Sequence, residues 1–361
     1  MISVYIHIPF CTQICSYCDF SKFFKNDEWI DNYLIKLEEE IKEKYKNEKV
    51  KTIYIGGGTP SCLNINQLNK LFNIIKIFAK TKNAEVTFEA NSEDLNEEKL
   101  KLLKKNINRL SIGIQTFDEK RLKTLNRSLN INNIKNALKE FENVNLDLMY
   151  GFKNQSLNEF KNDLNEILKL NPKHISAYSL IIEPHTKLFI KNYQRLDEDT
   201  DRNMYEILTE TLKENGYNHY EVSNYSKKGY ESNHNLVYWN NENYYGFGLS
   251  AGGYLNNIRY ENTRSITEYL KGNYLFESHE LDENETLENE FILGLRKTNG
   301  ININNFINKY NFNPLNIQLV KELLSQNLLI NKDENLYINP KYLYVSNEIL
   351  MKFINYPLHK H

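Results

Sequence analysis

The sequence predicts an α/β fold: a partial (β/α)6 barrel related to the TIM barrel, followed by a small winged-helix-like α+β domain at the C-terminus. Three observations predict it. In the first half of the chain, a short apolar run, a polar or glycine-containing turn and an amphipathic stretch recur six times. Polar or reactive residues end almost every apolar run. After about residue 190 this pattern stops, and the last segment combines short helical stretches with a hairpin.

The repeated apolar runs predict six parallel strands. They are rich in β-branched residues and lie at 3–8, 52–58, 85–91, 109–115, 145–151 and 174–182. Between them, segments with apolar residues at i, i+3, i+4 and i+7 predict helices, most clearly at 29–45, 66–80 and 157–170. Strand–helix units in series give right-handed crossovers, so the helices should cover the outside of the sheet. An open doubly wound sheet satisfies the same pattern.

The residues at the strand ends favour the barrel over the open sheet. His7, the glycines 56–58, Glu89, Gln115 and Asp147 all fall at the C-terminal ends of predicted strands. In a barrel these ends meet at one mouth, which is where barrel proteins build their sites. We therefore expect these side chains to surround a single functional site.

The second half of the chain predicts an extension and a separate small domain. A helix near 199–214 precedes an aromatic- and glycine-rich block at 232–255, and the stretch 327–339 predicts a hairpin that turns at 332–335. We expect a core at 1–190, a barrel extension at 191–280 and a C-terminal domain at 281–361. The last segment is not strongly basic, so docking on DNA gains little support.

Composition excludes several classes of protein. A net charge of −2 gives no indication of a nucleic-acid partner bound through bulk electrostatics. No apolar run approaches the roughly 18 residues of a membrane span, and the first residues resemble neither a signal peptide nor a transit peptide. The four cysteines do not form the pattern of a secreted disulfide framework. These features predict a cytoplasmic protein, although peripheral membrane contact and the oligomeric state stay open.

Cys11, Cys15 and Cys18 form a C-x3-C-x2-C cluster directly after the first predicted strand. A closed zinc site needs four ligands, and His7 would supply the fourth only if it pointed into the loop. A redox pair of Cys15 and Cys18 leaves Cys11 unexplained. Three thiolates suit a [4Fe–4S] cluster with one iron left open for a substrate or cofactor. The spacing alone leaves all three alternatives open.

The stretch YIHIPFCTQICSYCDF (5–20) resembles the signature of the radical S-adenosylmethionine (SAM) superfamily. More narrowly, it is similar to the branch that contains oxygen-independent coproporphyrinogen III oxidase (HemN) and the haem chaperone HemW. Further blocks resemble this branch in the same order along nearly the whole chain: IGGGTPS (55–61), EAN (89–91), RLSIGIQTFDEKRLKTLNR (109–127), DLMYG (147–151), HISAYSLIIEP (174–184) and LGLR (293–296).

This resemblance implies cofactors and the residues that bind them. The three cysteines of the cluster would hold a [4Fe–4S] cluster, and the amino and carboxylate groups of SAM would bind its open iron. Reduction of such a cluster can cleave SAM to a 5′-deoxyadenosyl radical. The residues that the resemblance assigns to SAM are Tyr5, Gly57, Gly58, Thr59, Glu89, Gln115, Arg127 and Asp147. Considered without the resemblance, the last four are ordinary polar groups at or near strand ends.

The segment HNLVYW (234–239) matches the HNxxYW motif that distinguishes the haem-chaperone branch from the oxidase branch. An imidazole can ligate haem iron, and aromatic rings pack on a porphyrin face, so the resemblance implies His234 as a haem contact. Composition alone predicts a hydrogen-bonded histidine of the core or its rim. Cys62 is expected to be buried and inert. The terminal HKH (359–361) is expected to be a solvated tail rather than a metal site.

Two departures from the oxidase branch favour the chaperone. HemN has a further cysteine two residues after the third, where this chain has Phe20, and it has an extension before its first strand, whereas this chain begins its first predicted strand at residue 3. We therefore expect a protein that binds a [4Fe–4S] cluster, SAM and haem, and passes haem to recipient haemoproteins. Coproporphyrinogen III oxidase is the alternative, and a zinc-stabilised binding module is the third.

Overall fold

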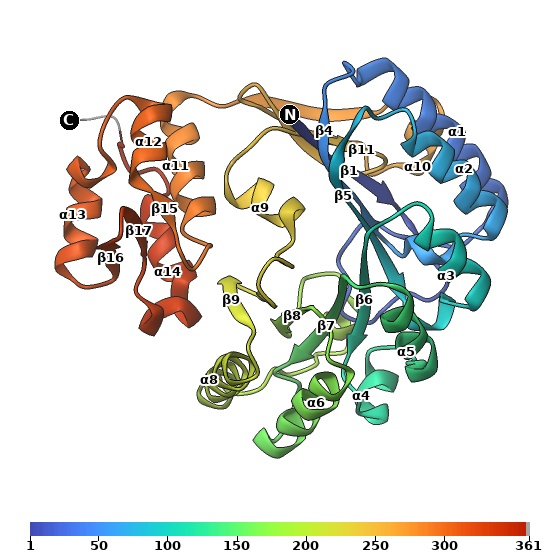
Figure 1. Ribbon diagram of the computed structural model, residues 1–361, viewed down its shortest axis with the longest axis horizontal. Coiled ribbons are helices and arrows are strands. Elements are labelled where there is room, and N and C mark those ends of the chain that lie inside the picture. Colours follow the sequence, from blue (N-terminus) through green and yellow to red (C-terminus); the bar gives the residue numbers. More distant parts are fainter. Residues whose placement is uncertain (359–361) are drawn as a thin grey trace.

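Twelve strands form one curved sheet in the computed structural model, which describes residues 1–358 (Figure 1). Its centre consists of six parallel strands in chain order, as predicted. These are β1 (Ile2–Ile8), β4 (Val50–Gly57), β5 (Lys80–Asn91), β6 (Arg109–Gln115), β7 (Val144–Tyr150) and β8 (His174–Ser179). The predicted strand 174–182 therefore ends at Ser179.

The remaining strands extend the sheet at both sides and leave it open. β11 (Tyr244–Phe247) is parallel to β1, and three antiparallel strands follow it outward: β12 (Gly252–Leu255), β13 (Ile258–Asn262) and β14 (Leu275–Glu280). On the other side, β10 (Asn224–Ser226) and β9 (Asn218–Glu221) add to β8. Because β9 and β14 are the two edges, the barrel is partial, as the sequence predicts.

Helices cover the outer face of the parallel strands (Figure 1). They are α1 (Asp27–Lys44), α2 (Ile65–Ile75), α3 (Glu97–Lys104), α4 (Glu119–Thr124), α5 (Ile131–Glu140) and α6 (Leu157–Leu170). Each begins after an Asn, Asp or Ser whose side chain accepts a hydrogen bond from a backbone N–H of the first turn. The predicted helix 66–80 ends earlier, at Ile75, because Lys80 already pairs with Val50 as the first residue of β5.

A second hydrophobic core lies within residues 287–358, around Phe291, Phe306 and Phe353. Helices and a small sheet enclose it: α11 (Glu283–Gly294), α12 (Ile303–Tyr310), α13 (Gln318–Ser325), α14 (Ser346–Leu350), β15 (Ile301–Asn302), β16 (Leu329–Lys332) and β17 (Asn335–Ile338). The hairpin of β16 and β17 turns between Lys332 and Asn335, as predicted. This α+β composition agrees with the winged-helix-like prediction.

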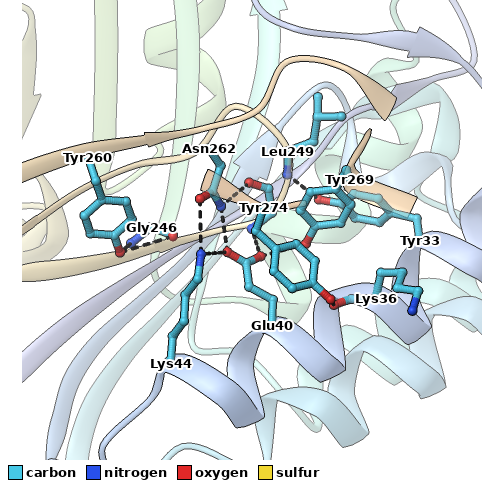
Figure 2. Close-up of polar contacts among 11 residues, drawn as sticks. Tyr33, Lys36, Glu40, Lys44, Gly246, Leu249, Tyr260, Asn262, Tyr269 and Tyr274 are labelled. Atoms are coloured by element: carbon cyan, nitrogen blue, oxygen red, sulfur yellow. Dashed lines mark hydrogen bonds and ion pairs between the residues drawn. The ribbon is translucent and has the colours of Figure 1, made fainter. Parts of the chain in front are cut away.

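The buried carboxylate of Glu40 connects α1 to the β11–β14 extension (Figure 2). Its Oε1 accepts hydrogen bonds from Lys44 Nζ at 2.9 Å and from Asn262 Nδ2 at 2.7 Å. Its Oε2 accepts from Gly248 N at 2.9 Å and from the Tyr269 hydroxyl at 2.7 Å. Every oxygen therefore has two donors, as a buried charge requires.

Tyr33 continues this network toward the first strand (Figure 2). Its hydroxyl donates to the carbonyl oxygen of His7 at 2.6 Å and accepts from Leu249 N at 3.0 Å. Its ring stacks on Tyr269 at 4.9 Å between centroids. The extension thus supports the end of β1, from which the cysteine loop begins.

No helix in residues 1–358 has the length and apolar content that a transmembrane span requires. The terminal HKH lies outside the described residues.

Candidate functional site

A cavity of about 460 Å³ lies at the C-terminal ends of the parallel strands, which we call the barrel mouth. It gathers residues that are far apart in the sequence, from the cysteine loop to β8 and the segment that follows it. Ten of the predicted site residues line it: Cys11, Cys15, Cys18, Gly57, Gly58, Thr59, Glu89, Gln115, Arg127 and Asp147. Tyr5 and His234 are not among its lining residues.

The three cysteines lie on a loop held in place at both ends. β2 (Phe10–Cys11) pairs with β3 (Phe23–Phe24), so the loop leaves and rejoins the fold at one point. The Thr59 hydroxyl donates to Cys11 Sγ at 3.4 Å, and Arg127 Nη1 donates to Cys15 Sγ at 3.4 Å. Burial raises the pKa of the Cys11 thiol to about 11. Donors aimed at sulfur suit thiolates that are charged when they bind a metal centre.

His7 joins this loop to the inside of the barrel. Its Nε2 lies 3.0 Å from the Ser21 carbonyl oxygen, and its Nδ1 lies 2.9 Å from the Tyr5 hydroxyl. Burial lowers the pKa of His7 to about 4, so the ring is neutral near pH 7. Tyr5 therefore lies one residue layer below the cavity and contacts the site through His7.

The glycines at 57 and 58 are required by the close approach of the cysteine loop. Gly57 has φ +114°, and a Cβ there would lie 2.7 Å from the His7 ring. A Cβ on Gly58 would lie 2.9 Å from the Phe10 carbonyl oxygen and 3.0 Å from Cys11 Sγ. Any side chain at either position would push the loop and its first thiol out of place.

Glu89 is a half-buried residue at the end of β5 whose carboxyl pKa is raised toward neutral pH. Oε1 accepts from the Tyr54 hydroxyl at 2.6 Å, and Oε2 accepts from Gly57 N at 3.1 Å. Burial, together with the charge of Asp147, raises the pKa of Glu89 to about 7, against the lowering effect of these two hydrogen bonds. A cationic ligand in the cavity would favour its ionised form.

Gln115 and Arg127 form the side of the cavity at the end of β6. Gln115 has φ +71°, a backbone conformation that is uncommon for residues other than glycine. It lies at a register shift between β6 and β7. Arg127 Nη2 donates to Asn91 Oδ1 and to the Gly113 carbonyl oxygen, each at 2.8 Å. Its Nε is buried and has no hydrogen-bond partner among residues 1–358. The guanidinium is thus firmly oriented but not saturated.

Asp147 begins a hydrogen-bond chain that leads away from the cavity into the barrel. It accepts from Asn145 Nδ2 at 2.7 Å, and Asn145 Oδ1 lies 2.6 Å from His174 Nδ1. His174 Nε2 lies 2.8 Å from the Tyr220 hydroxyl. Burial raises the pKa of Asp147, although hydrogen bonds and Arg109 oppose the shift. The cavity is therefore in polar contact with the opposite end of the barrel.

His234 lies at that opposite end, which we call the barrel floor: α9 (Asn233–Trp239) and the N-terminal halves of β4 and β5. Figure 1 shows α9 on the concave side of the curved sheet, opposite the helices that cover its outer face. The His234 side chain is fully buried, with Nδ1 2.8 Å from Thr52 Oγ1 and Nε2 2.8 Å from the Tyr238 hydroxyl. Burial lowers the pKa of His234 to about 3. Its role as a haem contact stays a prediction, since iron ligation would require one of these bonds to break.

Sequence reasoning assigned no role to several residues that line the cavity. They are Tyr17, Lys22, Asn91, Met149, Tyr178, Ser179, Ile181 and Glu183, together with others. Asn91 and Met149 lie two residues after Glu89 and Asp147, so the alternation of strand faces would have identified them. Tyr178 pairs with Met149 inside β8, so the same alternation would have identified it, whereas Ile181 and Glu183 lie beyond the end of β8, where no strand period applies.

The fourth cysteine lies outside the cavity. Cys62 is buried, as expected, and its thiol donates to the Phe10 carbonyl oxygen at 3.4 Å. Burial raises the pKa of Cys62 to about 12. Within residues 1–358, no three His, Cys, Asp or Glu side chains have the arrangement of ligands around a metal ion.

Comparison with known proteins identifies the family and the fold of the chain. A model of the radical SAM superfamily matches residues 5–167. The haem chaperone HemW of Lactococcus lactis is 39% identical over 98% of this chain and 97% of its own length. HemW of Bacillus subtilis is 38% identical over 98% of this chain and 99% of its own length. The structure of coproporphyrinogen III oxidase (HemN) from Escherichia coli superposes with a TM-score of 0.86, at 21% identity, over 98% of this chain and 90% of that one.

Proposed function

Because the chain belongs to the HemW family of radical SAM proteins, we propose that it is a haem chaperone that holds an iron–sulfur cluster and SAM at the barrel mouth and passes haem to recipient haemoproteins. The observation that carries the proposal is the match to HemW relatives along nearly the whole chain. The oxidase alternative has less support, because a structural likeness at 21% identity indicates only a common fold.

The cluster would be bound by Cys11, Cys15 and Cys18, and we propose that it is a [4Fe–4S] cluster. The residues present fit such a group, because three thiols line one cavity and two of them receive hydrogen bonds from fixed donors. Three protein ligands leave one iron for SAM. In this superfamily, a reduced cluster supplies the electron that cleaves SAM.

The remaining cavity residues would orient SAM. We propose that Gly57, Gly58 and Thr59 receive its methionine part, since only glycine backbone leaves room beside the cysteine loop. Glu89 and Asp147 would accept hydrogen bonds from its amino and hydroxyl groups.

On the other side of the cavity, Gln115 would contact SAM, and the Arg127 guanidinium, which lines the cavity, would face its carboxylate. Tyr5 would act one layer below, through its hydrogen bond to His7.

We also propose a division of the chain into three regions and a location in the cell. Residues 1–190 would form the cofactor-binding core, 191–280 its extension and 281–361 the C-terminal HemN-type domain. We propose a cytoplasmic location, in which thiols stay reduced and available to a cluster.

Anaerobic reconstitution tests each function separately. The reconstituted protein should contain iron and acid-labile sulfide, bind SAM, develop a Soret band when haem is added, and yield that haem to apomyoglobin. Absence of haem binding by the wild type would refute the chaperone function. Conversion of coproporphyrinogen III to protoporphyrinogen IX under reducing conditions would support the oxidase instead. One zinc per chain without sulfide would support a zinc-stabilised module.

A further inference from the structure

The barrel mouth has an apolar rim that is exposed to solvent. Large hydrophobic side chains beside the cavity are between 41% and 71% exposed: Phe20, Tyr178, Ile181, Phe189 and Ile190. Phe20, Tyr178 and Ile181 also line the cavity, so the rim is continuous with the proposed cofactor site. Large apolar side chains left exposed at a cavity are typical of a binding surface.

The rim is a fixed part of the fold next to the cysteine loop. Phe189 and Ile190 lie on α7 (Lys187–Ile190), whose Leu188 N donates to the Ser16 carbonyl oxygen at 2.9 Å. The Leu188 side chain is buried in a small cluster with Met149 and Leu180, against which Tyr17 packs. A ligand on the rim would therefore lie against a rigid surface beside the cluster-binding loop.

His185 lies between the rim residues Ile181 and Phe189 in the chain, on the turn that precedes α7. The turn is held by Thr186, whose hydroxyl donates to the Glu183 carbonyl oxygen at 2.7 Å and accepts from Phe189 N at 3.2 Å. His185 itself has φ +67°, and its side chain is exposed. Its ring has no hydrogen-bond or ionic partner among residues 1–358.

The other described histidines already have partners for their rings. Both ring nitrogens are hydrogen-bonded in His7, His174 and His234. His219 is largely buried, stacks on Tyr225 and bonds to the Val222 carbonyl oxygen at 3.2 Å. His279 is bound to the Glu285 carboxylate at 2.8 Å. Within residues 1–358, His185 is thus the histidine whose ring has no hydrogen-bond or ionic partner at either nitrogen.

We propose that haem binds on this rim, with His185 as an axial ligand of its iron. The inference rests on the proposed haem-chaperone function and gives it a site. A flat apolar macrocycle would cover Ile181, Phe189 and Ile190, and an exposed imidazole is a common ligand of haem iron. Haem and the cluster would then occupy neighbouring positions at the barrel mouth.

Charge complementarity favours the same occupant. Lys187 and Lys191 lie one helical turn apart beside the apolar side chains, and both are exposed. Neither makes an ion pair with another residue of the described chain. The two propionates of haem are expected on this side, away from Glu183 at the cavity wall.

A histidine series tests the site. Haem is titrated into wild type, His185→Ala, His234→Ala and His279→Ala, and the Soret band, affinity and stoichiometry are measured. His279 is the matched control, since it is exposed but lies on β14, outside the rim. His185→Ala should bind haem about tenfold or more weakly, with a shifted Soret band that added imidazole restores. His279→Ala should behave as wild type.

The outcomes separate this inference from the proposed function. Wild-type affinity and an unchanged Soret band in His185→Ala would overturn the rim site while leaving the chaperone function intact. Loss of the Soret band in His234→Ala alone would also overturn it and assign iron ligation to the barrel floor. Failure of the wild type to bind haem would refute the function itself. A second variant, Ile190→Glu, should weaken haem binding through the apolar surface, without changing the iron ligand.

Discussion

Polar and histidine side chains lie at both the barrel mouth and the barrel floor, but the two places differ in how far these side chains are hydrogen-bonded within the protein. At the floor, the Glu85 carboxylate accepts from the backbone of Asn233 and His234 at 3.0 Å each, and His234 has partners at both ring nitrogens. At the mouth, the Arg127 guanidinium lines an open cavity, and the exposed His185 ring nearby has no partner among the described residues. A satisfied polar network stabilises the fold, whereas an unsatisfied one at a cavity is prepared for a ligand.

The largest expected effect separates the three cysteines that line the cavity from Cys62, which does not line it. Cys15→Ala should abolish the cluster after reconstitution, because two thiolates do not retain it, and iron and sulfide content measure this directly. Cys62→Ala should keep the full iron content, since Cys62 does not line the cavity. An equal loss of iron and sulfide in both variants would contradict the assignment of only the cavity-lining cysteines to the cluster.

The second comparison sets two histidines against each other. His234→Ala should lower the free energy of unfolding by about 2–4 kcal/mol, because it leaves Thr52 and the Tyr238 hydroxyl without a partner and opens a cavity. His185→Ala should change it by less than about 0.5 kcal/mol, as for an exposed side chain. Urea denaturation of both variants measures the two values. Similar values would contradict the contrast between floor and mouth.

The third prediction concerns the protonation of Glu89 in the cavity at the barrel mouth. Because the pKa of Glu89 is raised to about 7, the carboxylate is ionised above that pH and protonated below it. Affinity for SAM, which carries a sulfonium charge, should therefore fall, by up to about tenfold per pH unit, as the pH is lowered from 7.5 to 6. Isothermal titration across this range measures it in the reconstituted protein. Glu89→Gln should bind SAM weakly and with little pH dependence, and an unchanged pH profile would exclude Glu89.

The smallest expected effect is electrostatic. Replacement of Lys187 and Lys191 by Ala should weaken haem binding only about two- to fivefold, because exposed ion pairs contribute little. The loss should be greatest at low salt and disappear at high salt, as screening predicts. Lys309, which lies outside the rim and pairs with Glu290, provides the control substitution. A salt-independent loss would indicate a packing role for the two lysines.

Much of the fold was predictable from local patterns. β-branched runs define the strands, and polar caps begin the helices, because these signals depend on neighbours in the chain. The end of α2 was less predictable, because Ile77 and Phe78 continue an apolar helical pattern although the backbone turns into β5 at Lys80. There, pairing with Val50 overrides local propensity.

The sequence by itself determined the three clustered cysteines, the order of the strands and the residues at their ends. These follow from spacing and period, and in a parallel barrel strand ends must meet. Only the tertiary structure decided which histidine is available. His234 is placed beneath Tyr54, with ring centroids 5.2 Å apart, by the packing of α9 on β4, whereas the turn at Thr186 places His185 in solvent. Nothing local to either histidine specifies this, because burial depends on contacts between segments distant in the chain.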